Sequence, residues 1–330
     1  MAGWFIGLAA VVFTAYALRY MTSMPGESWR GQLPPPSDEE RDLAVRLESH
    51  VTAIASGERN VPHYALLEKS AQYLEAELAK SGYRPRPQQF ASGGRAVRNI
   101  EVEIARTPGG APTSIVIAGA HYDSVHGAPG ANDNGSGVAA VLELARLLRG
   151  FSPPSGRALR LALFVNEEPP YFMSNEMGSV VYAREAKARG ERIDAMLSLE
   201  MLGYYRDAPG SQAYPFPLGL FYPDRADFIA FVGELGARPL VHRALASFRR
   251  HARFPSEGVA APAIVPGVNW SDHWSFTQQA YPAIMVTDTA FYRYAHYHQS
   301  SDTPDRLDYA RLAKVVLGLA AVMRDLTSDR

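Results

Sequence analysis

Two adjacent acids, Glu167 and Glu168, follow the apolar run 159–165 after a single asparagine. Two carboxylates at the end of a buried strand are costly to desolvate unless a cation compensates them. Neighbouring side chains of an extended segment point in different directions, so one acid can ligate a metal while the other acts as general base on a water. The alternative is a solvated turn, which Pro169 and Pro170 would favour.

A histidine and an acid two residues apart, His121 and Asp123, follow another apolar run, 114–120. Residues at this spacing face the same way in an extended segment, so the Asp123 carboxylate can reach the His121 ring. An acid in this position fixes the tautomer of a metal-bound histidine. A plain His–Asp hydrogen bond at a strand end is the simpler interpretation.

The glycine-rich segment 130–137 carries Asp133 and opens a predicted helix. Asp133 could be a simple helix cap. The glycines also let the backbone turn tightly and present a carboxylate into a crevice. There, the Asp133 carboxylate could bridge two metal ions, with one oxygen bound to each.

Glu200 lies in the apolar run 195–202, and His298 lies in a loop before the last predicted helix. The chain has no cysteine, so any metal must be held by His, Asp and Glu. Nitrogen and oxygen ligands suit Zn²⁺. We therefore predict two zinc ions bridged by Asp133, with Glu167 as general base and the metal ligands His121, Asp133, Glu168, Glu200 and His298.

Strand-like and helical segments alternate along the chain. We expect strands near 97–105, 114–120, 159–165, 195–202 and 282–288, and helices near 38–54, 65–80, 136–149, 174–189, 226–250 and 308–325. Several strands are continuous apolar runs, which predicts an α/β fold with a mixed, mostly parallel central sheet covered by helices on both faces. The polar clusters follow the carboxyl ends of strands, where open α/β sheets bind ligands.

Composition limits the possible functions. The 330 residues include 47% hydrophobic and 20% charged residues, with a net charge of −1. Lysine and arginine form no long run, so nucleic-acid binding is not expected.

The N-terminus differs from the rest of the chain. Residues 2–18 are uncharged and mostly apolar, at the lower edge of the length that spans a bilayer. Residues 15–17 also resemble a signal-peptidase site. We predict a hydrophobic anchor or signal over 1–24, a Pro-rich linker over 25–37 and a catalytic domain over 38–330. The protein is then expected at a membrane through this segment, or exported, which means the periplasm in a Gram-negative bacterium.

The motifs together resemble the M28 family of zinc peptidases, which includes aminopeptidases and, more distantly, glutaminyl cyclases. The similar stretches run in family order from about 115 to 309: AGAHYDSV, PGANDNGSGVAAVLELAR, FVNEE, SLEMLG, NWSDHWSF and YHQSSDTPDRLDY. The resemblance implies a sheet of about eight strands and a metallo-aminopeptidase acting on peptides. It implies one zinc at His121 and Glu200, a second at Glu168 and His298, Asp133 between them, Glu167 as base and Asp123 orienting His121.

Two departures from the family pattern concern the substrate side. A longer aromatic loop follows Glu168, and Val268 stands where several aminopeptidases have an oxyanion-stabilising tyrosine. The expected pocket residues are Tyr171, Phe172, Trp270, Asp272 and His273, which favour apolar N-terminal residues. His126 and His296 are interpreted as surface or pocket residues. The alternatives are a glutaminyl cyclase with one zinc and a non-catalytic, receptor-like protein.

Overall fold

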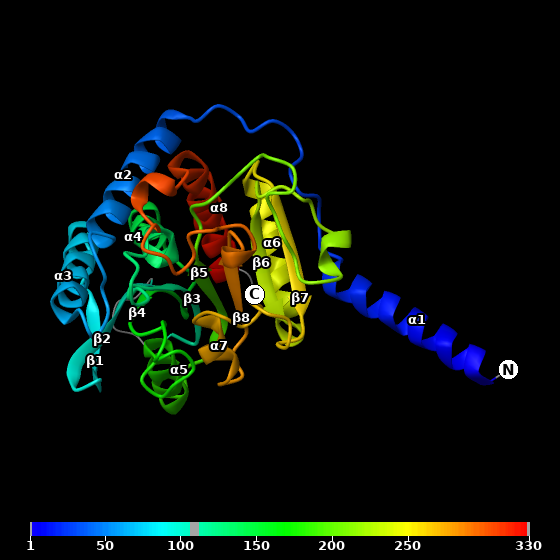
Figure 1. The fold of residues 1–330 in the computed structure, drawn as a ribbon. Coiled ribbons are helices and arrows are strands. Elements are labelled where there is room, and N and C mark those ends of the chain that lie inside the picture. The colour runs from blue at the N-terminus through cyan, green and yellow to red at the C-terminus, as the bar shows by residue number, and fades with distance from the viewer. Residues whose placement is uncertain (1, 106–111, 329–330) are drawn as a thin grey trace.

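The computed structural model describes residues 2–105 and 112–328 (Figure 1). One eight-stranded sheet forms its centre, with helices on both faces. The strands are β1 (Arg86–Ser92), β2 (Arg95–Ala105), β3 (Ser114–His121), β4 (Arg157–Phe164), β5 (Ile193–Glu200), β6 (Ile229–Glu234), β7 (Ser256–Ala261) and β8 (Ala283–Thr287). The helices are α1 (Ala2–Thr22), α2 (Asp38–Ile54), α3 (Tyr64–Lys80), α4 (Gly137–Leu147), α5 (Gly178–Ala188), α6 (Arg238–His251), α7 (His273–Thr277) and α8 (Tyr309–Ser328).

The sheet has the strand order β1-β2-β4-β3-β5-β8-β6-β7. The central strands β4, β3, β5 and β8 are parallel, as is the pair β6–β7, whereas β1–β2, β2–β4 and β6–β8 are antiparallel. The predicted mixed, mostly parallel sheet is therefore confirmed. The parallel centre brings the carboxyl ends of β3, β4 and β5 to one edge.

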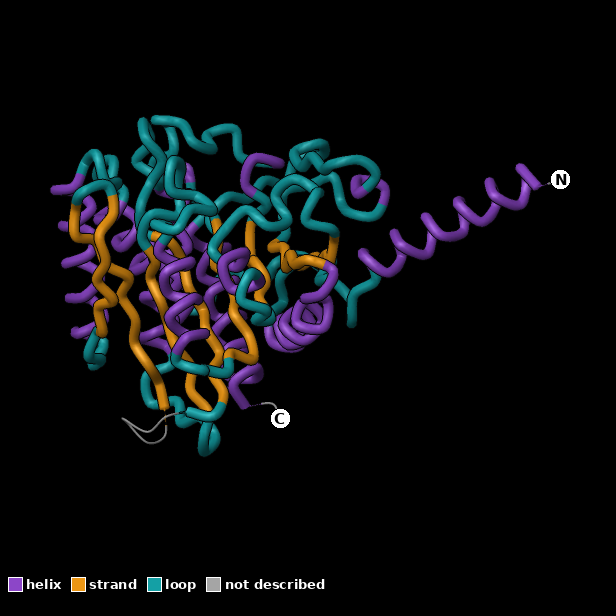
Figure 2. Tube along the Cα trace, turned by 90° about the horizontal axis from the view of Figure 1, so that it is seen from below, coloured by secondary structure: helices purple, strands orange, loops and turns teal. Residues whose placement is uncertain are grey.

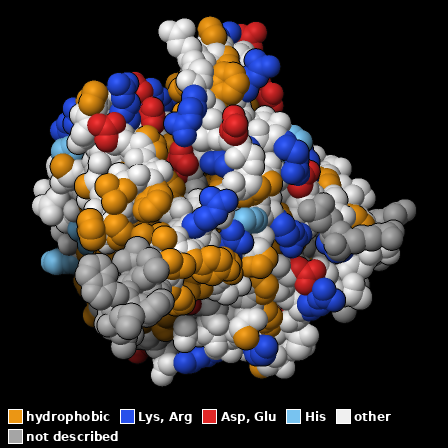
Figure 3. All heavy atoms as spheres, turned by 90° about the vertical axis from the view of Figure 1, so that its right-hand side faces the viewer, with side chains coloured by type: hydrophobic (Ala, Val, Ile, Leu, Met, Phe, Trp, Pro, Cys, Tyr) orange, Lys and Arg blue, Asp and Glu red, His pale blue; other side chains and the backbone are white. Residues whose placement is uncertain are grey.

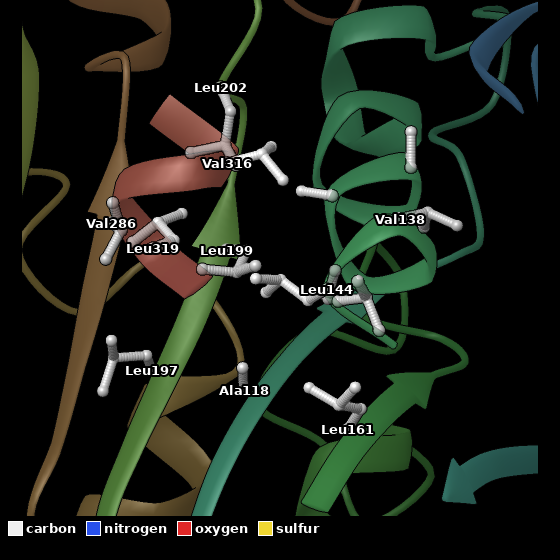
Figure 4. Packing of buried hydrophobic residues seen from close by; sticks show 14 of the residues in the cluster. Ala118, Val138, Leu144, Leu161, Leu197, Leu199, Leu202, Val286, Val316 and Leu319 are labelled. Atoms are coloured by element: carbon white, nitrogen blue, oxygen red, sulfur yellow. The ribbon is translucent and has the colours of Figure 1, made fainter. Parts of the chain in front are cut away.

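Alternating residues of the central strands fill two separate cores. Val116 and Ala118 of β3 join the large core under α2, α3, α4, α6 and α8, whereas Ile115 and Ile117 join the smaller core under α5 and α7. Figure 4 shows the larger core, where Leu199 of β5 faces side chains from α4 and α8. Because both faces are buried, these strands hold the residues at their ends rigidly in place.

One predicted helix was wrong in part. The segment 226–250 begins with strand β6, and α6 starts only at Arg238. Within β6, Ile229 and Phe231 face the large core while Ala230 and Val232 face a third apolar cluster. This alternation has the period of a strand. The helix expected over 174–189 begins at Gly178.

Besides β6, two further strands, β1 and β7, were not predicted from the sequence. Both are edge strands, and their sequences RPQQFAS and SEGVAA have few large apolar residues. β1 is largely exposed, whereas β7 is mostly buried but consists largely of small residues. Neither strand therefore contains a run of large apolar residues, and both give a weak sequence signal.

At the N-terminus, α1 projects away from the rest of the structure (Figures 1 and 2). Within the described part of the chain, no helix combines the length and the apolar character needed to cross a bilayer. The residues after α1 contact α6 and β7: Arg249 donates to Pro25 O at 2.8 Å, and Ser256 N donates to Ser28 Oγ at 2.9 Å. The domain boundaries at 24 and 37 stay predictions.

Candidate metal centre

The five predicted ligands come together at the carboxyl edge of the sheet. His121 ends β3, Glu200 ends β5, and Glu168 follows β4 by four residues. Asp133 and His298 reach the same place from the loop before α4 and the loop before α8. All are buried except His298, whose side chain is 28% exposed.

Two groups of three ligands share Asp133. His121 Nε2 lies 3.5 Å from Asp133 Oδ1 and 3.3 Å from Glu200 Oε2. His298 Nε2 lies 3.2 Å from Asp133 Oδ2 and 3.3 Å from Glu168 Oε2. Ligands about 2.1 Å from a tetrahedral zinc are separated by roughly 3.4 Å, so both groups have the right size. Each oxygen of Asp133 belongs to a different group.

Asp123 contacts both His121 and the backbone of the two adjacent acids. Its Oδ1 lies 3.5 Å from His121 Nδ1. Its two oxygens also accept the backbone N–H groups of Glu167 and Glu168, each at 3.1 Å. One carboxylate thus orients both the histidine and the acid pair.

Glu167 faces the first group but belongs to neither. Its Oε2 lies 3.8 Å from His121 Nε2, and the side chain is buried. Burial raises the pKa of its carboxyl well above the usual value, and the charges of Glu200 and Glu168 add to this effect. A carboxyl with a raised pKa next to a metal site can accept a proton and return it near neutral pH.

The charge balance of the centre favours a bound cation. Burial and the charge of Asp133 raise the pKa of Glu168 to about 7, and burial also raises the pKa of Glu200. Burial alone would lower the pKa of His298, but the contacts with Asp133 and Glu168 raise it to about 10. Buried acids in excess, with imidazole nitrogens between them, are a donor set that fits zinc.

One ligand and two residues next to residues of the centre have backbone conformations in the left-handed region. Asn166, Met201 and His298 have φ angles of 62°, 51° and 58°. Non-glycine residues adopt this conformation at an energetic cost, and such residues cluster at functional sites. Gly130 also has a positive φ, and an added Cβ would clash with Asp133 O.

Sequence reasoning missed several supporting residues. Arg59 is completely buried and donates to the backbone carbonyls of Tyr122 at 2.7 Å, Gly130 at 2.8 Å and Pro129, which fixes the loop before Asp133. Ser271 Oγ donates to Glu200 Oε2 at 2.8 Å.

Asp302 accepts the backbone N–H of Asp133 at 3.1 Å. Asp302 lies in the stretch YHQSSDTPDRLDY, but the sequence alone gave no sign of its contact with Asp133. Arg59 stands in no motif, and nothing in its surroundings in the sequence signals its role.

An apolar pocket of about 840 Å³, open to solvent, adjoins the centre and shares Glu200 and Tyr297 with it. Trp270 and Val268 line the pocket. Its aromatic lining residues are Tyr214, Tyr222, Phe228, Trp270, Phe291, Tyr292 and Tyr297.

The other four residues expected in the pocket lie elsewhere. Asp272 and His273 are completely buried, and His273 Nε2 lies 2.8 Å from Val268 O. Tyr171 packs against the large core. Phe172, in the same loop, also lies outside the pocket lining. The long loop after Glu168 therefore does not form this pocket.

The sequence profile of Peptidase family M28 matches residues 103–323. The chain belongs to this family. The chain is 41% identical over 266 residues to YfbL, an uncharacterized protein of Escherichia coli, covering 78% of this chain and 80% of that protein. It is 32% identical over 171 residues to leupeptin-inactivating enzyme 1 of Streptomyces exfoliatus, covering 51% of this chain but 37% of that enzyme.

Solved structures share the M28-like fold at low sequence identity. The LapA aminopeptidase of Legionella pneumophila superposes with a TM-score of 0.66 at 17% identity, covering 91% of this chain and 78% of LapA. A glutaminyl cyclase of Bacteroides thetaiotaomicron superposes with a TM-score of 0.65 at 17% identity, covering 89% of this chain and 99% of the cyclase. These likenesses establish the fold, a zinc-peptidase type of α/β sheet.

Proposed function

We propose that this protein is a zinc-dependent exopeptidase that removes N-terminal residues from peptides. The observation that carries the proposal is the pair of three-ligand groups sharing Asp133, with the spare acid Glu167 beside them and an apolar pocket adjoining. Membership of Peptidase family M28 supports it.

We further propose two zinc ions per chain. His121 and Glu200 would hold one, His298 and Glu168 the other, and Asp133 would contribute one oxygen to each. Three protein ligands for each ion leave a position open, as in catalytic zinc sites. When bound, zinc supplies Lewis acidity that polarises a carbonyl and lowers the pKa of water.

The residues around this centre have distinct tasks in hydrolysis. Glu167 takes a proton from the attacking water and returns it to the amine that leaves when the peptide bond breaks. Asp123 keeps His121 and the backbone of Glu167 in place through the contacts described above.

Tyr297 is the donor we propose for the oxyanion. Its ring stacks on that of His298 at a centroid distance of 3.8 Å, and it lines the pocket. Burial and the charges of Asp133 and Glu168 raise the pKa of its hydroxyl, which therefore keeps its proton for donation.

The pocket accounts for recognition of the N-terminal residue. Its apolar, aromatic lining fits a large apolar side chain. Glu200 at its boundary and the other acids of the centre attract a free α-ammonium group. A peptide blocked at its N-terminus lacks this charge, which favours exopeptidase over endopeptidase activity.

A glutaminyl cyclase is the second candidate, because solved cyclases share the fold. Cyclisation of an N-terminal glutamine uses no attacking water, and it needs only one zinc. The two complete ligand groups favour hydrolysis.

We also propose that the protein is held at a membrane or exported through its N-terminal segment. In α1, Val12, Phe13 and Tyr16 are 60%, 72% and 67% exposed. Figure 3 looks at the side from which α1 projects and shows apolar side chains gathered across this face. Near the end of α1, Met21 packs against the same apolar cluster as Tyr214, and the loop after Tyr214 exposes Phe216 and Leu220. Fractionation of cells that make either the full chain or a chain without residues 1–24 tests this proposal. We expect the full chain in the membrane or exported fraction and the shortened chain in the cytosol, and a full chain found in the cytosol contradicts the proposal.

A substrate panel tests the enzymatic proposal. Zinc-loaded protein is assayed with aminoacyl-arylamides, their N-acetylated counterparts and Gln-peptides, with and without chelator. We expect chelator-sensitive release of apolar N-terminal residues and no reaction of the acetylated compounds. Cyclisation of Gln-peptides without hydrolysis would establish the cyclase instead.

A further inference from the structure

A second histidine and acid cluster lies outside the metal centre. Glu58 and His63 stand in the connection between α2 and α3, and His126 stands in the loop between β3 and the Asp133 segment. Glu58 Oε2 lies 3.2 Å from His63 Nδ1 and 3.2 Å from His126 Nδ1. The two imidazole rings are stacked, with centroids 5.9 Å apart and planes at 17°. Both rings thus turn the same nitrogen toward one oxygen.

The contacts within this cluster are not hydrogen bonds. Glu58 Oε2 is a buried atom, and among the described residues it has no hydrogen-bond partner, although two ring nitrogens are 3.2 Å away. A buried carboxylate oxygen without a donor is unfavourable, because it has lost its hydration and gained no hydrogen bond in exchange. The separations instead match neighbouring ligands around a tetrahedral ion, which are roughly 3.4 Å apart.

The surroundings of the cluster are compatible with a cation. The backbone N–H of Gly127 holds the pKa of Glu58 below its usual value, so this carboxylate is charged at neutral pH. The side chains of His63 and His126 are 42% and 78% exposed, so an ion can enter from solvent. His63 Nδ1 also lies 3.0 Å from Asn60 Oδ1, and it would give up its proton when a metal binds.

We propose that Glu58, His63 and His126 form a further divalent-cation site, with a donor set of two imidazoles and one carboxylate that suits Zn²⁺. This assigns His126, interpreted from the sequence as a surface or pocket residue, a role as ligand. The site is separate from the two groups around Asp133 and does not depend on the proposed peptidase activity.

Its position gives the site a consequence for the metal centre. The loop of His126 contains Val125, whose N–H donates to Glu168 Oε1 at 3.1 Å, and follows Asp123, which holds Glu167 and Glu168. A cation that joins His126 to Glu58 and His63 would pin this loop to the α2–α3 connection. It would therefore reduce the local opening of residues 124–128.

Zinc stoichiometry tests the proposal. The full chain is stripped with chelator and dialysed against Zn²⁺ as the sole metal, and bound zinc is measured by mass spectrometry. The double variant His63→Ala/His126→Ala is compared with wild type and with His242→Ala/His251→Ala, which removes two histidines from α6. We expect the first variant to bind one ion fewer than both other proteins, however many ions the centre at Asp133 holds.

A second readout concerns the loop itself. Zinc is expected to slow amide hydrogen exchange at residues 124–128 more in wild type and in the α6 control than in His63→Ala/His126→Ala, which keeps only the contribution of the centre at Asp133 through the Val125–Glu168 bond. Equal zinc binding by all three folded proteins, or zinc protection of the loop that is as strong without the two histidines as with them, would overturn the proposal.

Discussion

Buried charged residues lie at two places along β4 and the segment that follows it, and the two groups differ in how their charges are balanced. In its middle, Arg160 is buried between Glu103 at 2.8 Å and Glu191 at 2.7 Å, with the Tyr182 hydroxyl at 3.3 Å. Beyond its end, the buried acids of the metal centre gather around two histidines. Arg86 also pairs with Glu103 and Arg189 with Glu191, so the first cluster balances its charges within the protein. The second leaves an excess of negative charge.

This difference indicates which cluster is structural and which is functional. A buried ion pair that is complete costs little to keep and much to break. An uncompensated group of carboxylates has raised pKa values, as at Glu167 and Glu168, and awaits a cation. The centre is therefore expected to respond to metal and pH, and the Arg160 cluster is not.

Removing the general base should give the largest effect. Glu167→Gln keeps the shape of the side chain but cannot accept the proton, so kcat is expected to fall about 10²- to 10⁴-fold. Zinc content should stay unchanged because Glu167 belongs to neither ligand group. Glu185→Gln, in an exposed position of α5, is the matched control. Normal turnover by Glu167→Gln would remove this residue from its role.

Breaking the paired cluster should cost stability without affecting chemistry. Arg160→Met leaves Glu103 and Glu191 without their buried partner, and we expect a loss of about 3–5 kcal/mol in the free energy of unfolding. Denaturation in urea measures this loss, and it should be the same with and without chelator. A chelator-dependent loss would mean that the two clusters are coupled.

Removing zinc should lower stability through the metal centre alone. At free zinc 100 times Kd, a single bound ion stabilises the folded state by about 2.7 kcal/mol, and chelation removes this contribution. Thermal unfolding with and without chelator measures it. No change in the midpoint would argue against a resident metal.

The metal-free protein should also depend on pH in a defined direction. The folded pKa of Glu168 is raised from 4.5 to about 7 and that of His298 from 6.5 to about 10, so the folded state binds more protons than the unfolded state within these intervals. Stability without metal should therefore fall as pH rises from about 4.5 to about 10. Stability that rises over this interval would contradict the assignment.

The smallest expected effect concerns the pocket. Val232 lines it, and Val232→Phe would fill part of the space. We expect roughly tenfold lower kcat/KM for leucyl and phenylalanyl substrates and little change for alanyl substrates, since a change of this size in an apolar pocket is worth about 1–3 kcal/mol. Equal losses for all three substrates would point to a general disturbance of the site.

Much of this architecture could be predicted because buried strands and their polar ends leave strong sequence signals. The apolar runs of β3, β4 and β5 stand out, and His121, Glu168 and Glu200 follow from them. The edge strands β1 and β7 could not be found by the same signal, since β1 is largely exposed and β7 is built mostly from small residues.

Long-range contacts of single polar residues were equally beyond reach of the sequence. Arg59 is joined to the loop before Asp133 by bonds to backbone carbonyls, and carbonyls carry no residue identity. The pairing of Glu58 with His126 depends on how two loops meet, which no local pattern encodes. The same holds for the pocket, where Tyr171 and Phe172 were expected and Tyr297 was not.

The central claim is that Asp133 lies between two zinc ions. A crystal of the zinc-loaded protein, measured on both sides of the zinc absorption edge, tests it directly. The account predicts two anomalous peaks, one beside His121 and Glu200 and one beside His298 and Glu168, with an oxygen of Asp133 next to each. A single peak, or peaks away from Asp133, would contradict it.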